Sequence, residues 1–121
     1  MHLRIAPNRL ISDLQKEFNN AFPFLKIEFF QSRNQQIPAF TFQQILPRNI
    51  RIVEGQTAIT DGDIEITSDM KVKDLEKIFK DQFSLLAQVF RRSGNLWLET
   101  TMTDDWTLEQ QNEHGREIST P

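Results

Sequence analysis

The sequence predicts an α+β fold: two repeated β-α-β-β units whose helices pack on a mainly antiparallel sheet, followed by a short C-terminal helix. Three observations lead to this prediction. Two segments match at a constant offset of 61 residues, both contain apolar residues at helical spacing, and alternating apolar segments flank them. A repeated supersecondary unit constrains architecture far more than composition does, so the repeat is the most informative feature of the chain.

The matching segments run from Leu10 to Phe22 and from Lys71 to Phe83. Apart from one lysine pair, their shared positions are apolar or helix-starting residue types rather than reactive groups. The repeat therefore predicts a core and not a chemistry. The identical pairs are Asp13 and Asp74, Leu14 and Leu75, Lys16 and Lys77, Phe18 and Phe79, and Phe22 and Phe83.

The first unit is expected to begin with a strand in which Leu3 and Ile5 alternate with polar residues. Ser12, with Gln15 three residues further on, forms a capping-box pattern that predicts a helix starting near Asp13. The spacing of the next apolar residues places them on one helical face. That face consists of Leu14, Phe18, Ala21 and Phe22.

The returning strand of the first unit is expected at residues 25–30, where apolar and polar residues alternate again. A Gln-rich loop at 31–38 and a partner strand at 39–45 follow it. Residues 47–62 connect the two units, with a short strand around Ile52.

The second unit repeats this order. A strand with Ile64 and Ile66 on one side precedes a helix, and the returning strand contains Ala87 and Val89. Residues 93–95, Ser-Gly-Asn, have the length and chemistry of a hairpin turn before the partner strand. The apolar stripe of the second helix consists of Leu75, Ile78, Phe79 and Phe83.

After the second unit, residues 107–110 form another capping-box pattern, which predicts a two-turn helix at 108–114. Gly115 fits the C-terminus of this helix, and residues 116–121 are expected to be a frayed tail.

The chain is long enough for one domain with one sizeable core. We divide that single domain, 1–121, into a first unit at 1–46, a connector at 47–62, and a second unit with the C-terminal helix at 63–115. A ferredoxin-like split, two half-domains related by a pseudo-twofold axis, and a β-grasp arrangement all remain open.

Composition excludes several classes of protein. The chain has no cysteine, so disulfides, thiolate metal sites and a cysteine nucleophile are ruled out. No apolar run approaches the roughly 20 residues that a membrane span needs, and the N-terminal segment lacks the apolar region of a signal peptide. We therefore expect a cytoplasmic protein without membrane contact.

Charge is unevenly distributed along the chain. Residues 1–53 carry seven basic and three acidic side chains, a net charge of +4, whereas residues 54–121 carry seven and fourteen, a net charge of −7. Either the two halves attract each other within one fold, or the surface has two poles that favour a charged partner or head-to-tail association.

Asp104 and Asp105 are adjacent carboxylates, a pattern that can serve acid–base chemistry or metal binding. Because they precede the expected last helix, the helix dipole already accounts for negative charge there. No nucleophile is visibly paired with them, and His2 and His114 lie at the two chain ends. We predict no catalytic, metal-binding or cofactor-binding residue. An enzyme that uses Asp104, Asp105 or Glu99 at a cleft edge is the second alternative.

A nucleic-acid-binding module is the first alternative. Its candidate residues are a basic stripe, defined as Lys73, Lys77 and Lys80 on one helical face, together with Arg91 and Arg92. Acidic residues interleave the stripe, among them Glu76, which is spaced as an i, i+4 partner of Lys80. These acids and the isoelectric point of about 5.4 disfavour nucleic acid as a partner.

If Leu96 and Leu98 face the core, Trp97 points to the other side of the sheet, beside Phe90 across the hairpin turn. Either the last helix covers this face with Trp106, or the face is open and binds a partner. The candidate interaction surface consists of Phe90, Arg91, Arg92, Trp97, Glu99, Thr101, Asp104, Asp105 and Trp106.

The turn Arg91-Arg92-Ser93-Gly94-Asn95 and the run from Thr103 to Leu108, Thr-Asp-Asp-Trp-Thr-Leu, resemble a domain of small uncharacterised bacterial proteins. The resemblance covers roughly the second half of the chain. It implies a bacterial origin and a domain type without known activity, and it assigns no functional residue.

The leading hypothesis is a non-enzymatic protein-interaction or regulatory module whose partner is another protein or a second copy of the chain, as a homodimer. It depends on the lack of a coherent catalytic constellation and on the charge-polarised, sheet-rich sequence. No cofactor is expected.

Overall fold

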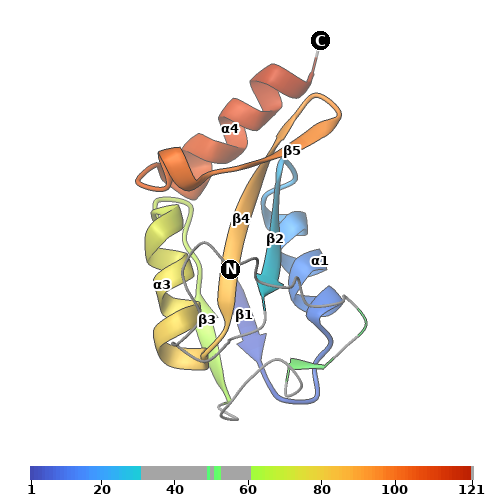
Figure 1. The fold of residues 1–121 in the computed structure, drawn as a ribbon, viewed down its shortest axis with the longest axis vertical. Coiled ribbons are helices and arrows are strands. Elements are labelled where there is room, and N and C mark those ends of the chain that lie inside the picture. Colours follow the sequence, from blue (N-terminus) through green and yellow to red (C-terminus); the bar gives the residue numbers. More distant parts are fainter. Residues whose placement is uncertain (31–48, 50, 53–60, 121) are drawn as a thin grey trace, which may run out of the picture.

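The structure is a computed structural model, and it describes residues 1–30, 49, 51–52 and 61–120. Within these residues the chain forms an α+β fold (Figure 1). The strands are β1 (His2–Ile5), β2 (Leu25–Phe30), β3 (Gly62–Glu65), β4 (Leu86–Ser93) and β5 (Leu96–Glu99), and the helices are α1 (Ile11–Ala21), α3 (Val72–Phe83), η1 (Thr101–Thr103) and α4 (Leu108–Ser119). The expected loop at 31–38 and strand at 39–45 lie outside the described residues.

The described strands form two antiparallel sheets. β1 pairs with β3, and the second sheet has the order β2-β4-β5. Leu3 lies opposite Ile64 in the first sheet, and Ile27 lies opposite Val89 in the second. The predicted hairpin turn joins β4 to β5, with Gly94 at a φ of 61°. Glycine adopts this left-handed conformation without the steric penalty of a Cβ.

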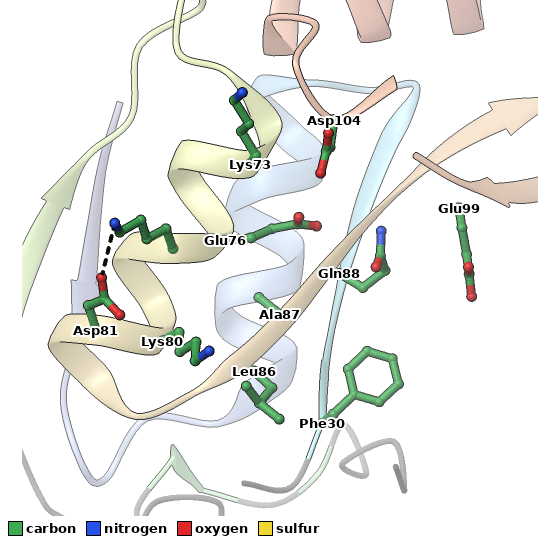
Figure 2. A pocket seen from close by; sticks show the side chains of 11 residues that line it. Phe30, Lys73, Glu76, Lys80, Asp81, Leu86, Ala87, Gln88, Glu99 and Asp104 are labelled. Atoms are coloured by element: carbon green, nitrogen blue, oxygen red, sulfur yellow. Dashed lines mark ion pairs between the residues drawn. The ribbon is translucent and has the colours of Figure 1, made fainter. Parts of the chain in front are cut away.

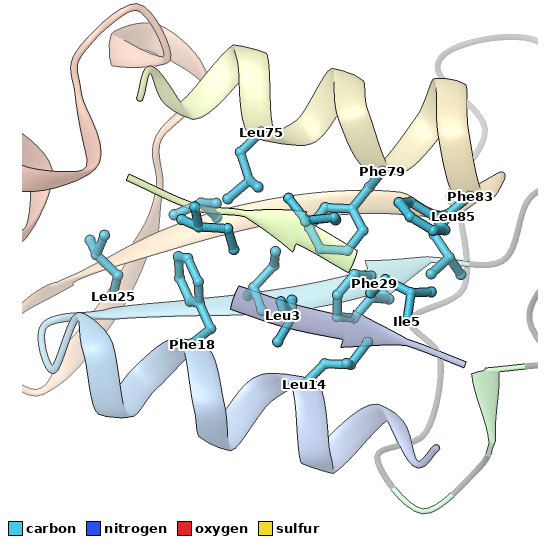
Figure 3. Close-up of a cluster of buried hydrophobic side chains, with 14 of the residues drawn as sticks. Leu3, Ile5, Leu14, Phe18, Leu25, Phe29, Leu75, Phe79, Phe83 and Leu85 are labelled. Carbon is cyan, nitrogen blue, oxygen red and sulfur yellow. The ribbon is translucent and has the colours of Figure 1, made fainter. Parts of the chain in front are cut away.

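Helices α1 and α3 lie on opposite sides of the strands, α1 beside β2 and α3 beside β4 (Figure 1). Their apolar faces meet the strands in one core (Figure 3). Phe79 contacts Phe29 edge-on, with 5.1 Å between the ring centroids. Of the two predicted apolar helical faces, Ala21 is exposed and Ile78 is only partly buried. The other six residues are buried as expected: Leu14, Phe18, Phe22, Leu75, Phe79 and Phe83.

The β1–β3 sheet buries its apolar face in this core and exposes a charged face to water. His2 lies 2.7 Å from the Glu65 carboxylate, and Arg4 lies within 4 Å of both Asp61 and Asp63. These exposed pairs stabilise the fold by only about 0–1 kcal/mol each. They join basic residues of the first half of the chain to acidic residues of the second half, so part of the opposite charge of the two halves is neutralised by contacts within the fold.

The first helix begins before the predicted start. α1 starts at Ile11, and its cap position is Leu10 rather than Ser12. The N–H of Leu10 donates to the Asp13 carboxylate at 3.0 Å, and Leu10 also forms an isolated β-bridge with Arg51. Because a residue in a bridge is extended, the helix begins directly after it, and this non-local contact is invisible in the local sequence pattern.

The last helix is longer than predicted, since α4 extends to Ser119 instead of ending at His114. The predicted capping box is confirmed: the N–H of Gln110 donates to the Thr107 hydroxyl at 3.1 Å, and the N–H of Thr107 donates to the Gln110 side chain at 2.9 Å. Gly115 is not a C-terminal signal but a buried mid-helix residue. The residues expected to form a frayed tail are therefore mostly helical.

None of the helices in the described ranges combines the length and the apolar character needed to cross a membrane.

Candidate functional site

A pocket of about 630 Å³ lies between α3 and one end of β4 (Figure 2). β5 pairs with β4 only from Phe90 to Ser93, so the first half of β4 has no strand beside it on that side within the described residues. The pocket occupies this position. Its polar lining includes Lys73, Glu76, Lys80, Gln88, Glu99 and Asp104.

Glu76 extends from α3 toward β4, and its carboxylate accepts the N–H of Val89 at 3.0 Å. The pKa of Glu76 is raised from 4.5 to about 7, chiefly because the side chain is buried. The hydrogen bond from Val89 lowers this pKa, and the nearby Asp104 carboxylate raises it. At neutral pH the side chain is therefore divided between its charged and neutral forms.

The pocket contains charged side chains of both signs, and most of them are not paired with one another. One ion pair joins two of its lining residues, Lys77 and Asp81, at 3.9 Å, and both side chains are exposed (Figure 2). Among the described residues, no ion pair within 4.0 Å joins Glu76 or Asp104 to a cation. The same holds for the two other lysines of the lining, Lys73 and Lys80.

Replacing Glu76 with glutamine is expected to make the protein more stable, relative to wild type, as the pH rises. The folded pKa of Glu76 lies above its unfolded value, so the folded state holds the proton more tightly. The stability contributed by this group is therefore present below about pH 4.5 and is lost as the pH rises through about 7. Glutamine stays neutral, and its amide oxygen still accepts the Val89 N–H.

Urea unfolding of both proteins at about pH 5 and about pH 8 measures this effect. The difference between variant and wild type should move in favour of the variant at the higher pH. An identical difference at the two pH values would show that the environment of Glu76 does not raise its pKa.

Strand β5 exposes a continuous apolar stretch. Leu96 is 65 % exposed, Leu98 is 41 % exposed and Trp97 is 36 % exposed. The expectation that both leucines face the core is wrong. Leu96 lies opposite Ser93 and Leu98 lies opposite Arg91. Near the hairpin turn, β4 therefore has polar residues at the positions where a core would require apolar ones.

Trp97 and Phe90 do not face each other directly across the hairpin. Trp97 lies opposite Arg92, and Phe90 lies opposite Glu99. The ammonium group of Lys26 lies over both rings instead, 5.2 Å from the Phe90 centroid and 5.3 Å from the Trp97 centroid. This is a cation–π arrangement, so a side chain of β2 lies over the two aromatic residues.

The last helix packs on the opposite face of β4, the face that carries Arg91. The Arg91 guanidinium donates to the Gln111 side chain at 2.8 Å and lies 5.9 Å from the Trp106 ring centroid. Trp106 in turn meets His114 edge-on, at a centroid distance of 5.6 Å. Arg91 and Trp106 therefore serve internal packing, and α4 does not cover Trp97.

The structure brings together only part of the predicted site. Glu99 and Asp104 line the pocket with the basic stripe, whereas Asp105 is exposed and is not part of the lining. Arg92 and Thr101 are exposed near β5. Residues from two separate hypotheses, the lysines and the carboxylates, thus share one pocket. In the described part of the chain, no three acidic or histidine side chains are close enough to hold a metal ion.

Sequence reasoning missed the role of Glu76. Its spacing to Lys80 is typical of a surface pair, yet its side chain bonds to β4. One signal was available, because Glu76 matches Gln15 at the offset of 61. The Gln15 side chain donates to the carbonyl of Ile27 at 2.9 Å. In both helices, the polar side chain at this position forms a hydrogen bond with a backbone group at the edge of a strand.

Comparisons with models of known protein families, with curated proteins and with solved structures found no match. The resemblance to small bacterial proteins therefore stays a prediction. The pocket and the exposed strand β5 are the two features of the described residues that indicate a function.

Proposed function

We propose that this protein is an interaction module that pairs with a second copy of itself through the outer edge of β5. The supporting observation is the strand itself. β5 is the terminal strand of its sheet among the described residues, and its three consecutive apolar residues, 96–98, are exposed. An unpaired strand edge is a template for pairing with another chain, and strand addition is a recurrent mode of recognition.

The backbone directions along β5 favour such pairing. The N–H of Thr100 donates to the carbonyl of Val89 at 3.3 Å. Because backbone directions alternate along an antiparallel strand, the N–H and carbonyl of Leu98 also point toward β4. Those of Trp97 and Glu99 point away from β4, at the free edge of β5. The outward groups have no strand partner in the described ranges, and they are the groups that a second strand would bind.

A twofold axis at Trp97 gives a self-complementary register. It places Trp97 opposite its own copy, Leu96 opposite Leu98, and Asn95 opposite Glu99. The leucines then meet on one face of the joined sheet and the tryptophans on the other. Glu99, the charged residue of β5, meets an amide rather than a like charge, which would be destabilising. Both copies use the same patch, as a closed dimer requires.

Light scattering coupled to size-exclusion chromatography should show a dimer that forms with rising concentration and persists at high salt. Glu99→Pro should abolish it, because proline removes an outward N–H without breaking the ladder to β4. Trp97→Lys should abolish it as well, because it places two ammonium groups opposite each other.

Met102→Gln is the matched control for the dimer. It removes a side chain that is 94 % exposed but lies just outside β5, so the dimer should survive. Circular dichroism checks that each variant is folded. A wild-type chain that stays monomeric at high concentration, in both low and high salt, would refute the proposal, as would a dimer that tolerates Glu99→Pro.

We also propose that the two halves are structural repeats. The N–H of Ile52 donates to the carbonyl of Arg9 at 2.8 Å, and the N–H of Leu108 donates to the carbonyl of Met70 at 2.9 Å. Met70 lies at the repeat offset from Arg9. The segment before α1 and the segment before α3 are thus anchored in a similar way, the first to Ile52 in the connector and the second to Leu108 at the start of α4.

A further inference from the structure

Two of the four carboxylates that line the pocket, Glu76 and Asp104, approach the same space from different elements. Glu76 comes from α3, and Asp104 comes from the segment after η1 (Figure 2). The carbonyl of Asp104 accepts the N–H of Lys73 at 2.8 Å, which fixes this segment against the first turn of α3. Two like charges held near each other repel, so a cation placed between them would be bound favourably.

Lysines lie on both sides of Glu76 along α3. Lys73 and Lys80 are three residues before and four residues after Glu76, so all three project from one side of α3. Both lysines line the pocket, and neither forms an ion pair with another described residue. The pocket therefore offers a place for a cation with places for an anion next to it.

We propose that this pocket binds a small zwitterion, a molecule that carries an ammonium group and a carboxylate, as amino acids do. The ammonium group lies between Glu76 and Asp104, and the carboxylate reaches Lys73 or Lys80. A polyamine is a poorer fit because the flanking lysines repel a second positive charge. Glu99 lies on β5 and also lines the pocket, but the proposed positions of the ammonium group and the carboxylate do not use it, so the proposal does not depend on self-association.

The size and backbone of the pocket agree with such a ligand. Its volume of about 630 Å³ lies within the range of about 300–1,000 Å³ that is usual for small-molecule sites. Ala87 lines the pocket where β4 has no strand beside it in the described residues. The N–H of Arg92 donates to the Phe24 carbonyl, so the backbone groups of Arg92 point toward β2. Backbone directions alternate from one residue of a strand to the next, and Ala87 is an odd number of residues from Arg92. The N–H and carbonyl of Ala87 therefore point the other way, toward the pocket. These groups can bind a polar ligand.

Three probes of matched length test the proposal: 6-aminohexanoate, which has both charges, hexylamine, which has only the cation, and hexanoate, which has only the anion. Backbone amide NMR shifts report binding at residues around the pocket, such as Val89. The aminohexanoate should bind roughly tenfold more tightly than either single-charge probe, as the loss of one charge-assisted hydrogen bond predicts.

Variants then assign the charges. Glu76→Gln should weaken binding of the aminohexanoate roughly tenfold or more, and at least one of Lys73→Gln and Lys80→Gln should weaken it by a similar factor. Glu65→Gln, which removes an exposed acid on β3 outside the pocket, should change nothing. Equal binding of all three probes, shifts that do not map to the pocket, or insensitivity to Glu76→Gln would overturn the proposal.

Discussion

Replacing Phe79 with alanine is expected to lower the free energy of unfolding by about 3–5 kcal/mol, the largest effect of any single change considered for this protein. Phe79 is fully buried, and its ring meets Phe29 edge-on at 5.1 Å. The loss combines the transfer of the ring to water, the cavity left behind and the ring contact. Because a domain of this kind is stable by about 5–15 kcal/mol, the variant should lie near the limit of folding.

Urea unfolding followed by circular dichroism measures the effect, with Phe18→Ala as the counterpart in the first half. Phe18 is also fully buried and lies 5.4 Å from the Phe22 ring, so its loss should be of similar size. Ile78→Ala in the same helix as Phe79 is the control. Its side chain is only partly buried at the border of the core, so its effect should be clearly smaller. A decrease below about 1 kcal/mol for Phe79→Ala, typical of surface positions, would contradict this account of the core.

The core is the part of the molecule that sequence periodicity predicts well. Apolar residues at helical spacing, such as Phe18 and Phe79, must be buried wherever the helices pack, because exposing them to water is unfavourable. The alternation around Leu3, Ile27 and Ile64 likewise predicted strands that the structure confirms. These patterns depend on the period of a local element and not on how the elements meet.

The pattern fails where burial depends on the neighbouring strand. Leu96 and Leu98 alternate with Trp97 in the same way as core residues do, yet they are exposed. The reason is that their partners on β4 are Ser93 and Arg91, where the core has already ended. A period of two identifies the strand and its two faces, but it does not say how far along the strand the core extends.

The candidate pocket was predictable only in fragments. The basic stripe follows from helical spacing, but its proximity to Asp104 depends on contacts between segments far apart in the sequence. Lys73 meets the Asp104 carbonyl, and Val72 donates its N–H to the carbonyl of Trp106 at 3.1 Å. Glu76 gains its raised pKa from the burial that this packing produces. Local sequence cannot show such convergence because each residue is ordinary in its own segment.

Replacing Gly115 with valine is expected to separate α4 from the sheet and to lower the free energy of unfolding by about 1–3 kcal/mol, the usual range for overpacking. A Cβ at this position would lie 3.0 Å from the Cβ of Phe24, 3.1 Å from the Cγ of Arg91 and 3.2 Å from the carbonyl oxygen of Phe24. Two of these neighbours are fixed by the backbone of the segment before β2, so they cannot move away as the end of a flexible side chain would.

Whether Gly115→Val lowers or raises the free energy of unfolding distinguishes close packing from the usual behaviour of glycine in a helix. In an exposed helix, glycine is less favourable than alanine by about 1 kcal/mol, so replacing it normally stabilises. Here the gain in helix propensity is opposed by the clash, and the two methyl groups of valine make the clash dominant. Glu117→Ala, an exposed change in the same helix, is the control and should leave stability within about 0.5 kcal/mol.

Amide hydrogen exchange locates the loss. In the Gly115→Val protein, the amides of α4 should lose protection while those of α1 and α3 keep it, because the Phe79 core does not depend on this contact. The hydrogen bond from Phe24 N–H to the Asn112 side chain, 2.9 Å long, should weaken together with the helix. A valine variant as stable as wild type would mean that α4 does not approach the sheet at Gly115 as closely as the structure has it.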